Sequence, residues 1–420
     1  MEKFHFSAML WLTFIETSTA LRFYCEVNNM CKIWNWNPRV EGTFVLHHIP
    51  NTHGTVELYN LLISSTSSEL FEIFETSRQH METSLTVKMS AIHSFVLKYG
   101  ATLKSVEFEN TYLSSIQFGK NCSVMKLKIK RSKLSHFPNT MQELKDLHSL
   151  TISYSLIQAV NLNILAELPR LEMLDLARNR IHSLYCAVEK SLTSMLNTVY
   201  LEQNRLRSIN MNLFNGMKSL EKIDLSHNLI SVVSGSLVSS GLYFLDLSFN
   251  RLLKLDCCKW IVPNLYNLLI SDNLFHSLPR CIEKALINVS FVDLQNNQLH
   301  PDELFRIGKL VNLQFLTLDN NRLTHAILNK STIPIKMKHL SLRKNKLKHL
   351  EIPYVANKDI CIDVASNCIS SIDWNKVSTN LTKLKMEGNP LDCSLTSSVK
   401  IRSNFLCIKN KTNDCDVHIR

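Results

Sequence analysis

The 12 cysteines are the residues of this 420-residue sequence whose chemistry is easiest to identify. So many cysteines are typical of an oxidising compartment, where they form disulfides. Cys25 and Cys31 are close enough in the sequence to close a small loop. Three others lie near the C-terminus, at Cys393, Cys407 and Cys415. Because three is an odd number, either Cys368 or Cys361 supplies a partner, or one cysteine pairs with another chain.

Enzymatic chemistry has no comparable signal. The sequence contains no GxSxG, HExxH, Walker or GxGxxG motif and no CxxC pair with zinc-ligand spacing. The 16 histidines are scattered, and the group Asp224, Ser226 and His227 falls within a repeated consensus. Only 9 residues are glycine, which argues against Gly-rich phosphate loops. We therefore expect no enzymatic activity, no cofactor and no metal site.

A second chemical group, the asparagine amide, recurs among leucines at a fixed spacing. The stretch LDLSFN ends at Asn250, and the same pattern returns about every 23 residues. These anchor asparagines are Asn179, Asn204, Asn228, Asn250, Asn273, Asn297, Asn321, Asn345, Asn367 and Asn389. Upstream, smaller polar residues occupy the same slot at Ser90, Thr111, Ser132 and Ser155. An amide can donate to and accept from the backbone of adjacent turns, so we expect the anchors to be structural.

The residues around each anchor explain how the chain must fold to place these amides. In all fourteen units the positions five and three before the anchor and two after it are apolar. This pattern, LxxLxLxxNxL, resembles the leucine-rich repeat. The alternation before the anchor predicts one short strand a unit, and neighbouring strands stack into a parallel sheet. We predict an α/β leucine-rich repeat solenoid, or horseshoe, of about 14 repeats with cysteine-bearing caps.

The ends of the sequence predict secretion. Lys3, the apolar run from Phe4 to Ile15 and the small residues Ser18 and Ala20 read as a signal peptide. No later segment is apolar enough to span a membrane, and the tail carries no lipid-anchor signal. We expect an extracellular protein with a signal peptide (1–20), an N-terminal cap and irregular first repeat (21–80), leucine-rich repeats (81–391) and a C-terminal cap (392–420).

Five N-glycosylation sequons agree with an extracellular chain, at Asn121, Asn288, Asn329, Asn380 and Asn410. None of the four sequons within the repeats falls on a predicted strand. Attached glycans would therefore leave the sheet face open.

The repeat register also predicts a disulfide between turns. Cys258 and Cys281 both stand eight residues after their anchors. Equivalent positions in adjacent turns lie about one strand spacing apart, within disulfide range. This leaves Cys257, Cys122 and Cys186, which we expect to be buried thiols.

The chain as a whole resembles the secreted leucine-rich immune proteins of mosquitoes. The resemblance rests on the signal peptide, irregular repeats and the ending LTKLKMEGNPLDCSL. It implies an immune function, and in long family members a double cysteine and a coiled coil support disulfide-linked dimers and complexes with complement-like proteins. Here the double cysteine Cys257-Cys258 lies inside the repeats and no heptads precede Arg420, so the sequence is closer to a coil-less type.

Charge on the predicted sheet face alternates along the solenoid. Outward positions are six, four, two and one before the anchor. They carry an early basic group (Lys126, Lys128, Lys130, Arg131), a late basic group (His339, Arg343, Lys344) and acidic residues between (Asp175, Glu202, Asp224, Asp246, Asp272, Asp293, Asp319). A net charge of +11 favours acidic glycans, microbial surfaces or acidic proteins as ligands. The alternatives are that the basic residues only form a solvated surface and that the aspartates only follow the repeat consensus.

Aromatic residues align on the same face. Phe244, Phe291 and Phe315 stand six residues before their anchors, with Asn267 between the first two, and Phe249 lies nearby. Aromatic side chains dominate binding hot spots, so this stripe is a candidate patch for a protein partner. The alternative is that these rings pack against one another at the sheet edge.

Two functions fit the sequence. One is a secreted innate-immune protein that binds a partner or microbial ligand through its concave face, with a disulfide-linked dimer left open. The other is an extracellular matrix or adhesion protein. We do not expect nucleic-acid binding, because no stacking platform or known module is present.

Overall fold

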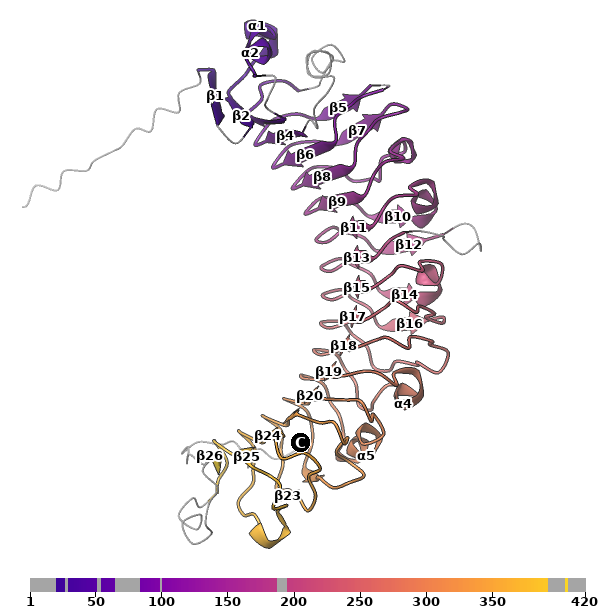
Figure 1. The fold of residues 1–420 in the computed structure, drawn as a ribbon, viewed down its shortest axis with the longest axis vertical. Helices are drawn as coiled ribbons and strands as arrows, with labels where there is room; N and C mark the ends of the chain where they lie inside the picture. Colours follow the sequence, from indigo (N-terminus) through magenta and orange to yellow (C-terminus); the bar gives the residue numbers. More distant parts are fainter. Residues whose placement is uncertain are drawn as a thin grey trace, which may run out of the picture.

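The computed structural model describes residues 20–26, 29–50, 54–64, 84–98, 100–186, 195–391 and 405–406. Most of the predicted signal peptide lies outside these ranges, as do Asn410 and the cysteines Cys393, Cys407 and Cys415. The described chain forms one curved solenoid, with its long sheet on the inner side of the arc (Figure 1).

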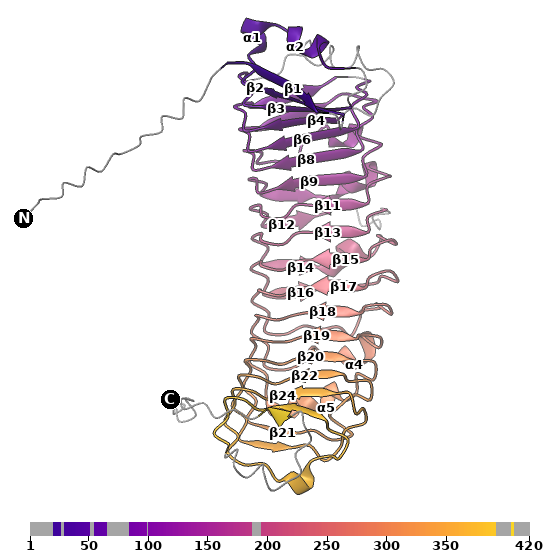
Figure 2. The same cartoon turned by 60° about the vertical axis from the view of Figure 1, so that its left-hand side comes forward.

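The inner, concave side is an 18-stranded sheet. Its first two strands are antiparallel, and every later pair is parallel. In spatial order the strands are β1 (Arg22–Glu26), β2 (Met30–Trp34), β3 (Thr55–Tyr59), β4 (Ser84–Lys88), β6 (Ser105–Glu109), β8 (Lys126–Lys130), β9 (Ser149–Ser153), β11 (Met173–Asp175), β13 (Thr198–Tyr200), β15 (Lys222–Asp224), β17 (Phe244–Asp246), β18 (Asn267–Leu269), β19 (Phe291–Asp293), β20 (Phe315–Thr317), β22 (His339–Ser341), β24 (Cys361–Asp363), β25 (Lys383–Lys385) and β26 (Phe405–Leu406). Figure 2 shows these strands stacked along the length of the solenoid.

The outer, convex side carries short strands and single helical turns. Four two-stranded parallel sheets lie there, formed by β5 (Ser94–Leu97) with β7 (Ser115–Phe118), β10 (Ala159–Asn161) with β12 (Ser183–Tyr185), β14 (Ser208–Asn210) with β16 (Val232–Ser234), and β21 (His325–Ile327) with β23 (His349–Glu351). The 3-10 turns are η1 (Met141–Glu143), η2 (Leu162–Glu167), η3 (Met211–Phe214), η4 (Pro301–Glu303) and η5 (Trp374–Lys376). The α-helices are α1 (Pro38–Glu41) and α2 (Phe44–His47) at the N-terminal end, and α4 (Ile282–Ala285) and α5 (Leu304–Ile307) on the convex side.

One apolar core runs the length of the solenoid between these two sides. The inward residues of successive strands, such as Leu245, Leu268 and Val292, are fully buried and paired in register. The predicted fold is therefore confirmed as a leucine-rich repeat solenoid of about 14 turns with a parallel sheet.

Each anchor asparagine joins two turns through its side chain. The Nδ2 amide of Asn228 donates to the carbonyl of Leu201 in the preceding turn (3.0 Å) and to those of Leu225 and Ser226 in its own turn (both 3.1 Å). Its Oδ1 accepts from the backbone N–H of Leu206 (3.1 Å). These bonds satisfy buried backbone groups that would each cost about 1–3 kcal/mol if left unpaired.

The smaller anchors make fewer bonds. Ser132 and Ser155 bond to each other (2.9 Å), and Ser132 Oγ accepts from the backbone N–H of Leu134. Thr111 Oγ1 is buried and has no hydrogen-bond partner among the described residues. A hydroxyl thus replaces only part of what the amide supplies.

The residue before each anchor has a left-handed backbone conformation. Its φ lies between 47° and 58° from Met89 to Ser366 and is 73° at Gly388, and Asn60, at the equivalent place after β3, has a φ of 51°. Such angles are uncommon for residues other than glycine and mark the sharp turn at the end of the strand. The set, here called the edge column, is Asn60, Met89, Asn110, Arg131, Tyr154, Arg178, Gln203, His227, Phe249, Asp272, Asn296, Asn320, Lys344 and Ser366.

Two disulfides lie where the sequence predicts them. Cys25 joins Cys31 between β1 and β2, and Cys258 joins Cys281 between adjacent turns, with Cα atoms 4.0 and 4.9 Å apart. Cys368 is also disulfide-bonded, whereas Cys361 is a half-buried thiol. Of the two candidates for pairing with the C-terminal cysteines, Cys368 is therefore the one that forms a bond.

The remaining cysteines differ in exposure. Cys257 is a buried thiol, and burial raises its pKa strongly. Cys122 is buried and donates to the carbonyls of Lys98 and Gly119. Cys186 is only half-buried, contrary to the prediction, because it lies on the convex side and donates to Asn163 Oδ1 (2.9 Å).

Candidate ligand-binding face

The concave sheet exposes fewer positions than the alternation of the strands predicts. Two residues before the anchor, the side chains of Ser226, Ser248 and Ser271 are buried, so in these units the predicted outward position is covered. Arg343, at the same position of a later unit, is exposed. The rest of the outward surface is made by the positions six and four before the anchor and by the edge column.

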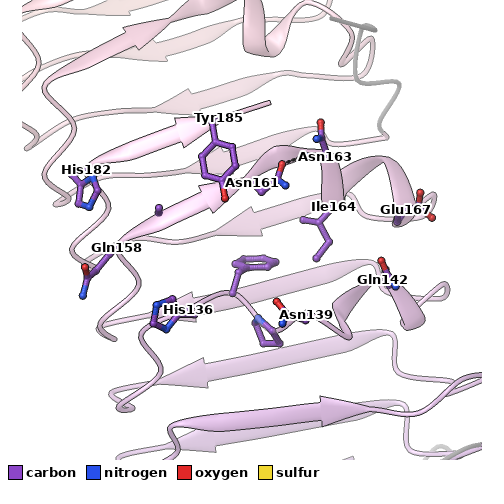
Figure 3. Close-up of a pocket in the computed structure, with 13 residues that line it drawn as sticks. His136, Asn139, Gln142, Gln158, Asn161, Asn163, Ile164, Glu167, His182 and Tyr185 are labelled. Carbon is purple, nitrogen blue, oxygen red and sulfur yellow. Dashed lines mark hydrogen bonds between the residues drawn. The ribbon is translucent and has the colours of Figure 1, made fainter. Parts of the chain in front are cut away.

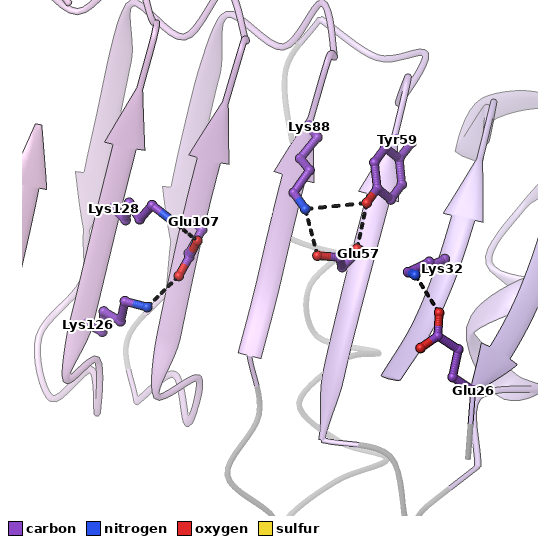
Figure 4. Close-up of polar contacts among 8 residues, drawn as sticks. All are labelled: Glu26, Lys32, Glu57, Tyr59, Lys88, Glu107, Lys126 and Lys128. Carbon is purple, nitrogen blue, oxygen red and sulfur yellow. Dashed lines mark hydrogen bonds and ion pairs between the residues drawn. The ribbon is translucent and has the colours of Figure 1, made fainter. Parts of the chain in front are cut away.

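The N-terminal third of the face is a ladder of ion pairs (Figure 4). Glu57 on β3 accepts from Lys88 Nζ (2.7 Å) and from the hydroxyl of Tyr59 (2.6 Å). Burial opposes ionisation of this carboxyl, but the two hydrogen bonds together with nearby charge outweigh it, and the pKa of Glu57 is lowered. Lys32 pairs with Glu26 in the same way on the first two strands.

The early basic group is largely paired with acidic neighbours. Glu107 on β6 lies between Lys126 (2.7 Å) and Lys128 (2.8 Å), and Arg131 is 3.5 Å from Glu109. Burial raises the pKa of Asp175, and the nearby charge of Lys130 offsets this only in part. The sequence carried a signal for these pairs, since Glu107 and Glu109 are the outward residues of the preceding unit.

The middle of the face is acidic, and its carboxylates are tied to the backbone. Asp224 and Asp246 each accept, through Oδ1, from the backbone N–H two residues later (3.0 and 2.8 Å). Burial raises the pKa of Asp246, and repulsion from Asp224 adds to it. Burial also raises the pKa of Asp175, Glu202 and Asp293.

These carboxylates do not form a metal centre in the part of the chain that the structure describes. No group of three or more His, Cys, Asp or Glu side chains there has metal-binding geometry. The aspartates at this position, including Asp293 and Asp363, instead hold the strand ends through backbone hydrogen bonds.

The edge column forms stacks and hydrogen bonds between turns. Tyr154 lies between the guanidinium groups of Arg131 and Arg178, which are 5.0 and 4.7 Å from its ring centre. His227 and Phe249 stack with ring centres 4.0 Å apart and planes 8° apart. Further along, Asn296 donates to Asp272 (2.8 Å) and Asn320 donates to Asn296 (2.7 Å).

The phenylalanine stripe is partly exposed and partly packed. Phe249 and Phe315 are 46% and 38% exposed, while Phe244 and Phe291 are half-buried. Phe291 and Phe315 are register partners on β19 and β20. Lys222 Nζ lies 4.7 Å from the Phe244 ring centre and 4.8 Å from that of Tyr200.

Two exposed tyrosines directly precede strands of this face. Tyr243 and Tyr266 are 44% and 46% exposed and stand one residue before Phe244 and Asn267. Reading the position seven residues before the anchor in these two units, as well as the position six before it, would have found them.

One residue of the late basic group, Arg343, lies near a buried carboxylate. Arg343 and Lys385 each lie 3.7 Å from Oδ2 of buried Asp363. These three residues line a hollow of about 370 Å³ together with Glu387. Lys344 lies beside it in the edge column, and burial lowers the pKa of His339 on β22.

The described sequons lie away from the concave sheet. Asn121 and Asn288 are exposed, and Asn329 and Asn380 are half-buried. The side-chain amides of Asn288 and Asn380 donate to carbonyls of the preceding turn, Pro263 (2.8 Å) and Val355 (3.1 Å). Asn329 Oδ1 accepts from the backbone of Ser331.

Comparisons with known proteins support the repeat fold. The family model for the leucine rich repeat matches residues 102–181 and 194–252. No curated protein matches the chain. Among the described helices, none is long and apolar enough to cross a membrane.

Several solved structures share the architecture at low sequence identity. A leucine-rich repeat protein of Leptospira interrogans has a TM-score of 0.59 at 18% identity, covering 86% of this chain and 90% of its own. The leucine-rich repeat domain of mosquito APL1 has 0.51 at 20% identity, covering 91% and 92%. The mosquito LRIM1/APL1C complex has 0.52 at 18% identity, covering 91% and 65%. At these identities the likeness establishes the fold.

Proposed function

We propose that this protein is secreted and binds a protein partner or a microbial ligand through its concave face, as part of innate immunity. The observation that carries the proposal is the aromatic stripe of Phe244, Phe291 and Phe315, of which Phe291 and Phe315 are register partners and Phe315 is 38% exposed, on a sheet held by the asparagine ladder. Aromatic side chains on a rigid support contribute large contact area at low entropic cost.

Charge around the patch restricts the ligand. The aromatic residues adjoin Asp246 and Asp293, so a partner that covers them must also meet carboxylates. A protein surface that combines an apolar centre with basic groups at its rim satisfies both requirements.

The immune part of the proposal rests on the sequence resemblance, and the assembly part is supported by a solved structure. The LRIM1/APL1C complex is an assembly of two proteins with the same repeat architecture. The disulfides Cys25–Cys31 and Cys258–Cys281 support an extracellular location, since such bonds persist in oxidising compartments.

The test is capture of a partner from body fluid by the chain expressed from Leu21 in a secretory host. The Phe291→Ala, Phe315→Ala variant should lose most of the captured partner while its circular dichroism stays unchanged. Phe305→Ala, which removes a 56% exposed ring within α5 on the convex side, is the matched control and should bind normally. Equal capture by all three proteins would contradict the proposed patch.

Gel electrophoresis with and without reductant tests whether the protein forms a disulfide-linked dimer. A reducible dimer linked through the C-terminal cysteines would support covalent complexes like those that the sequence resemblance implies. Retention of the protein in tissue, with attachment that depends on calcium or glycans, would instead favour the extracellular matrix or adhesion function.

A further inference from the structure

A hollow of about 640 Å³ lies on the convex side, away from the concave face (Figure 3). Three successive turns line it, through the segment before η1, through β10 and η2, and through β12. Figure 3 shows His136 and Asn139 on one side of this space and Tyr185 on the other, with Asn161 and Ile164 between them. Its volume is in the range of sites for small molecules.

The lining offers several amide groups that the protein does not use. The side chains of Asn139, Gln142 and Gln158 have no hydrogen-bond partner among the described residues, and all three are exposed to the hollow. Each presents an acceptor oxygen and two donor hydrogens. Asn161 differs, because its Oδ1 already accepts from the backbone N–H of Asn163 (3.0 Å).

Charge in the hollow is balanced. The one carboxylate of the lining, Glu167, is 3.1 Å from Lys145 Nζ. An anionic or cationic ligand would therefore find no unpaired opposite carboxylate or ammonium there. The many polar atoms make the hollow equally unsuitable for an acyl chain, since they would lose water without replacement.

Two aromatic rings complete the lining. Tyr185 is 50% exposed at the end of β12, and Phe137 lies in the turn before η1. An aromatic face packs well against the C–H groups of a sugar ring, while adjacent hydroxyls pair with amide side chains.

We propose that this hollow binds a neutral oligosaccharide of a few sugar units. Unused amides, balanced charge and aromatic rings in one open space are the combination that such a ligand requires. The site is independent of the proposed function, because it lies on the opposite side of the solenoid from the aromatic patch. Both surfaces can be occupied at once.

The experiment measures binding of the full chain to labelled neutral oligosaccharides of three to six units, built from glucose, mannose, galactose or N-acetylglucosamine. A sulfated oligosaccharide of equal length is the charged comparison. We expect at least one neutral compound to bind, with little dependence on salt, because no net charge is involved.

Variants locate the site. The Gln158→Ala, Tyr185→Ala double variant should bind roughly tenfold more weakly, since it removes one hydrogen-bonding amide and one ring. Ala159→Trp keeps every polar group but fills the hollow, and should abolish binding. His276→Ala is the matched control, because His276 stands three residues after its anchor, as Gln158 does in the hollow, but lies several turns away.

Each outcome decides the proposal. Failure of every neutral oligosaccharide to bind, binding of the sulfated compound alone, or unchanged binding by either variant that folds would overturn it. Circular dichroism and the urea midpoint establish whether each variant folds. The Phe291→Ala, Phe315→Ala variant should still bind the oligosaccharide, so the two proposals fail separately.

Discussion

The side chain of an anchor asparagine forms hydrogen bonds with backbone groups that would otherwise lack a partner. Asn250 donates to the carbonyls of Leu225, Leu247 and Ser248 and accepts from the backbone N–H of Ile230. The amide offers two donor hydrogens and an acceptor oxygen at the strand end. A hydroxyl, as at Thr111, is shorter and has only one donor hydrogen, so it leaves part of the buried backbone to other partners.

Asn250→Ala should therefore lower the free energy of unfolding by about 3 kcal/mol, because it leaves one buried N–H and several carbonyls without partners. The measurement is the urea unfolding midpoint. Asn264→Ala is the control, since exposed Asn264 makes a single bond to the Ser240 carbonyl (2.7 Å), and should cost less than about 1 kcal/mol. Equal losses would contradict the role assigned to the anchors.

Two carboxylates on the concave face, Asp246 and Glu57, should change the stability of the fold in opposite directions as the pH falls. Burial raises the pKa of Asp246 in the folded state, so its charge penalises folding above that pKa, and stability is regained as the pH falls toward the unfolded value near ~4. The pKa of Glu57 is lowered, so its contribution is present at neutral pH and is lost as the pH falls through the folded value.

Asp246→Asn should consequently raise the urea midpoint at pH 7, because an amide still accepts from Ser248 without carrying charge. Glu57→Gln should lower it, because Lys88 loses its ionic partner. The difference for Asp246→Asn should shrink toward pH 4, whereas that for Glu57→Gln should shrink only as the pH falls below the unfolded value of glutamate, ~4.3. A decrease for both variants at pH 7 would show that the aspartate is stabilising.

At the scale of elements, packing between turns limits which residues fit. Gly308 follows α5, and a Cβ built on it would lie 1.8 Å from the carbonyl oxygen of Ser331 in the next turn. Backbone lies on both sides of this contact, so neither partner can rotate away.

Gly308→Ala should lower the free energy of unfolding by about 2 kcal/mol or more, since over-packing forces the two turns apart. The thermal midpoint is a sufficient measurement. Lys309→Ala, at the adjacent exposed residue, should change it little. A midpoint equal to wild type would mean that the two turns separate at no cost.

The elements that recur in every repeat could be predicted from the sequence, whereas those that differ between repeats could not. Spacing alone placed the strands, the anchors and the Cys258–Cys281 bond, because equivalent positions in adjacent turns must be neighbours. Pairing between turns, as between Glu107 and Lys128, required reading two units together. The hollow beside Tyr185 arises from convex segments that share no period, so no sequence pattern pointed to it.

For the whole molecule, the repeat architecture means that each turn touches only its neighbours. The free energy of unfolding should then be approximately the sum of the contributions of the single turns and of the interfaces between them. A weak interface should open locally. The charge follows the same one-dimensional order, with ion pairs at the N-terminal end, carboxylates in the middle and Arg343 and Lys385 near the end.

Asn250→Ala tests this one-dimensional behaviour, because both of its inter-turn bonds, to Leu225 and Ile230, face the preceding turn. Hydrogen exchange should show protection lost first between β15 and β17, while β4, β6 and β8 keep theirs. On the other side, Asn273 still accepts from Leu252, and the Cys258–Cys281 disulfide still joins the two turns. Reductant should therefore extend the loss toward β18 in the variant more than in the wild type. Equal loss of protection along the whole chain would mean that the solenoid unfolds as one cooperative unit.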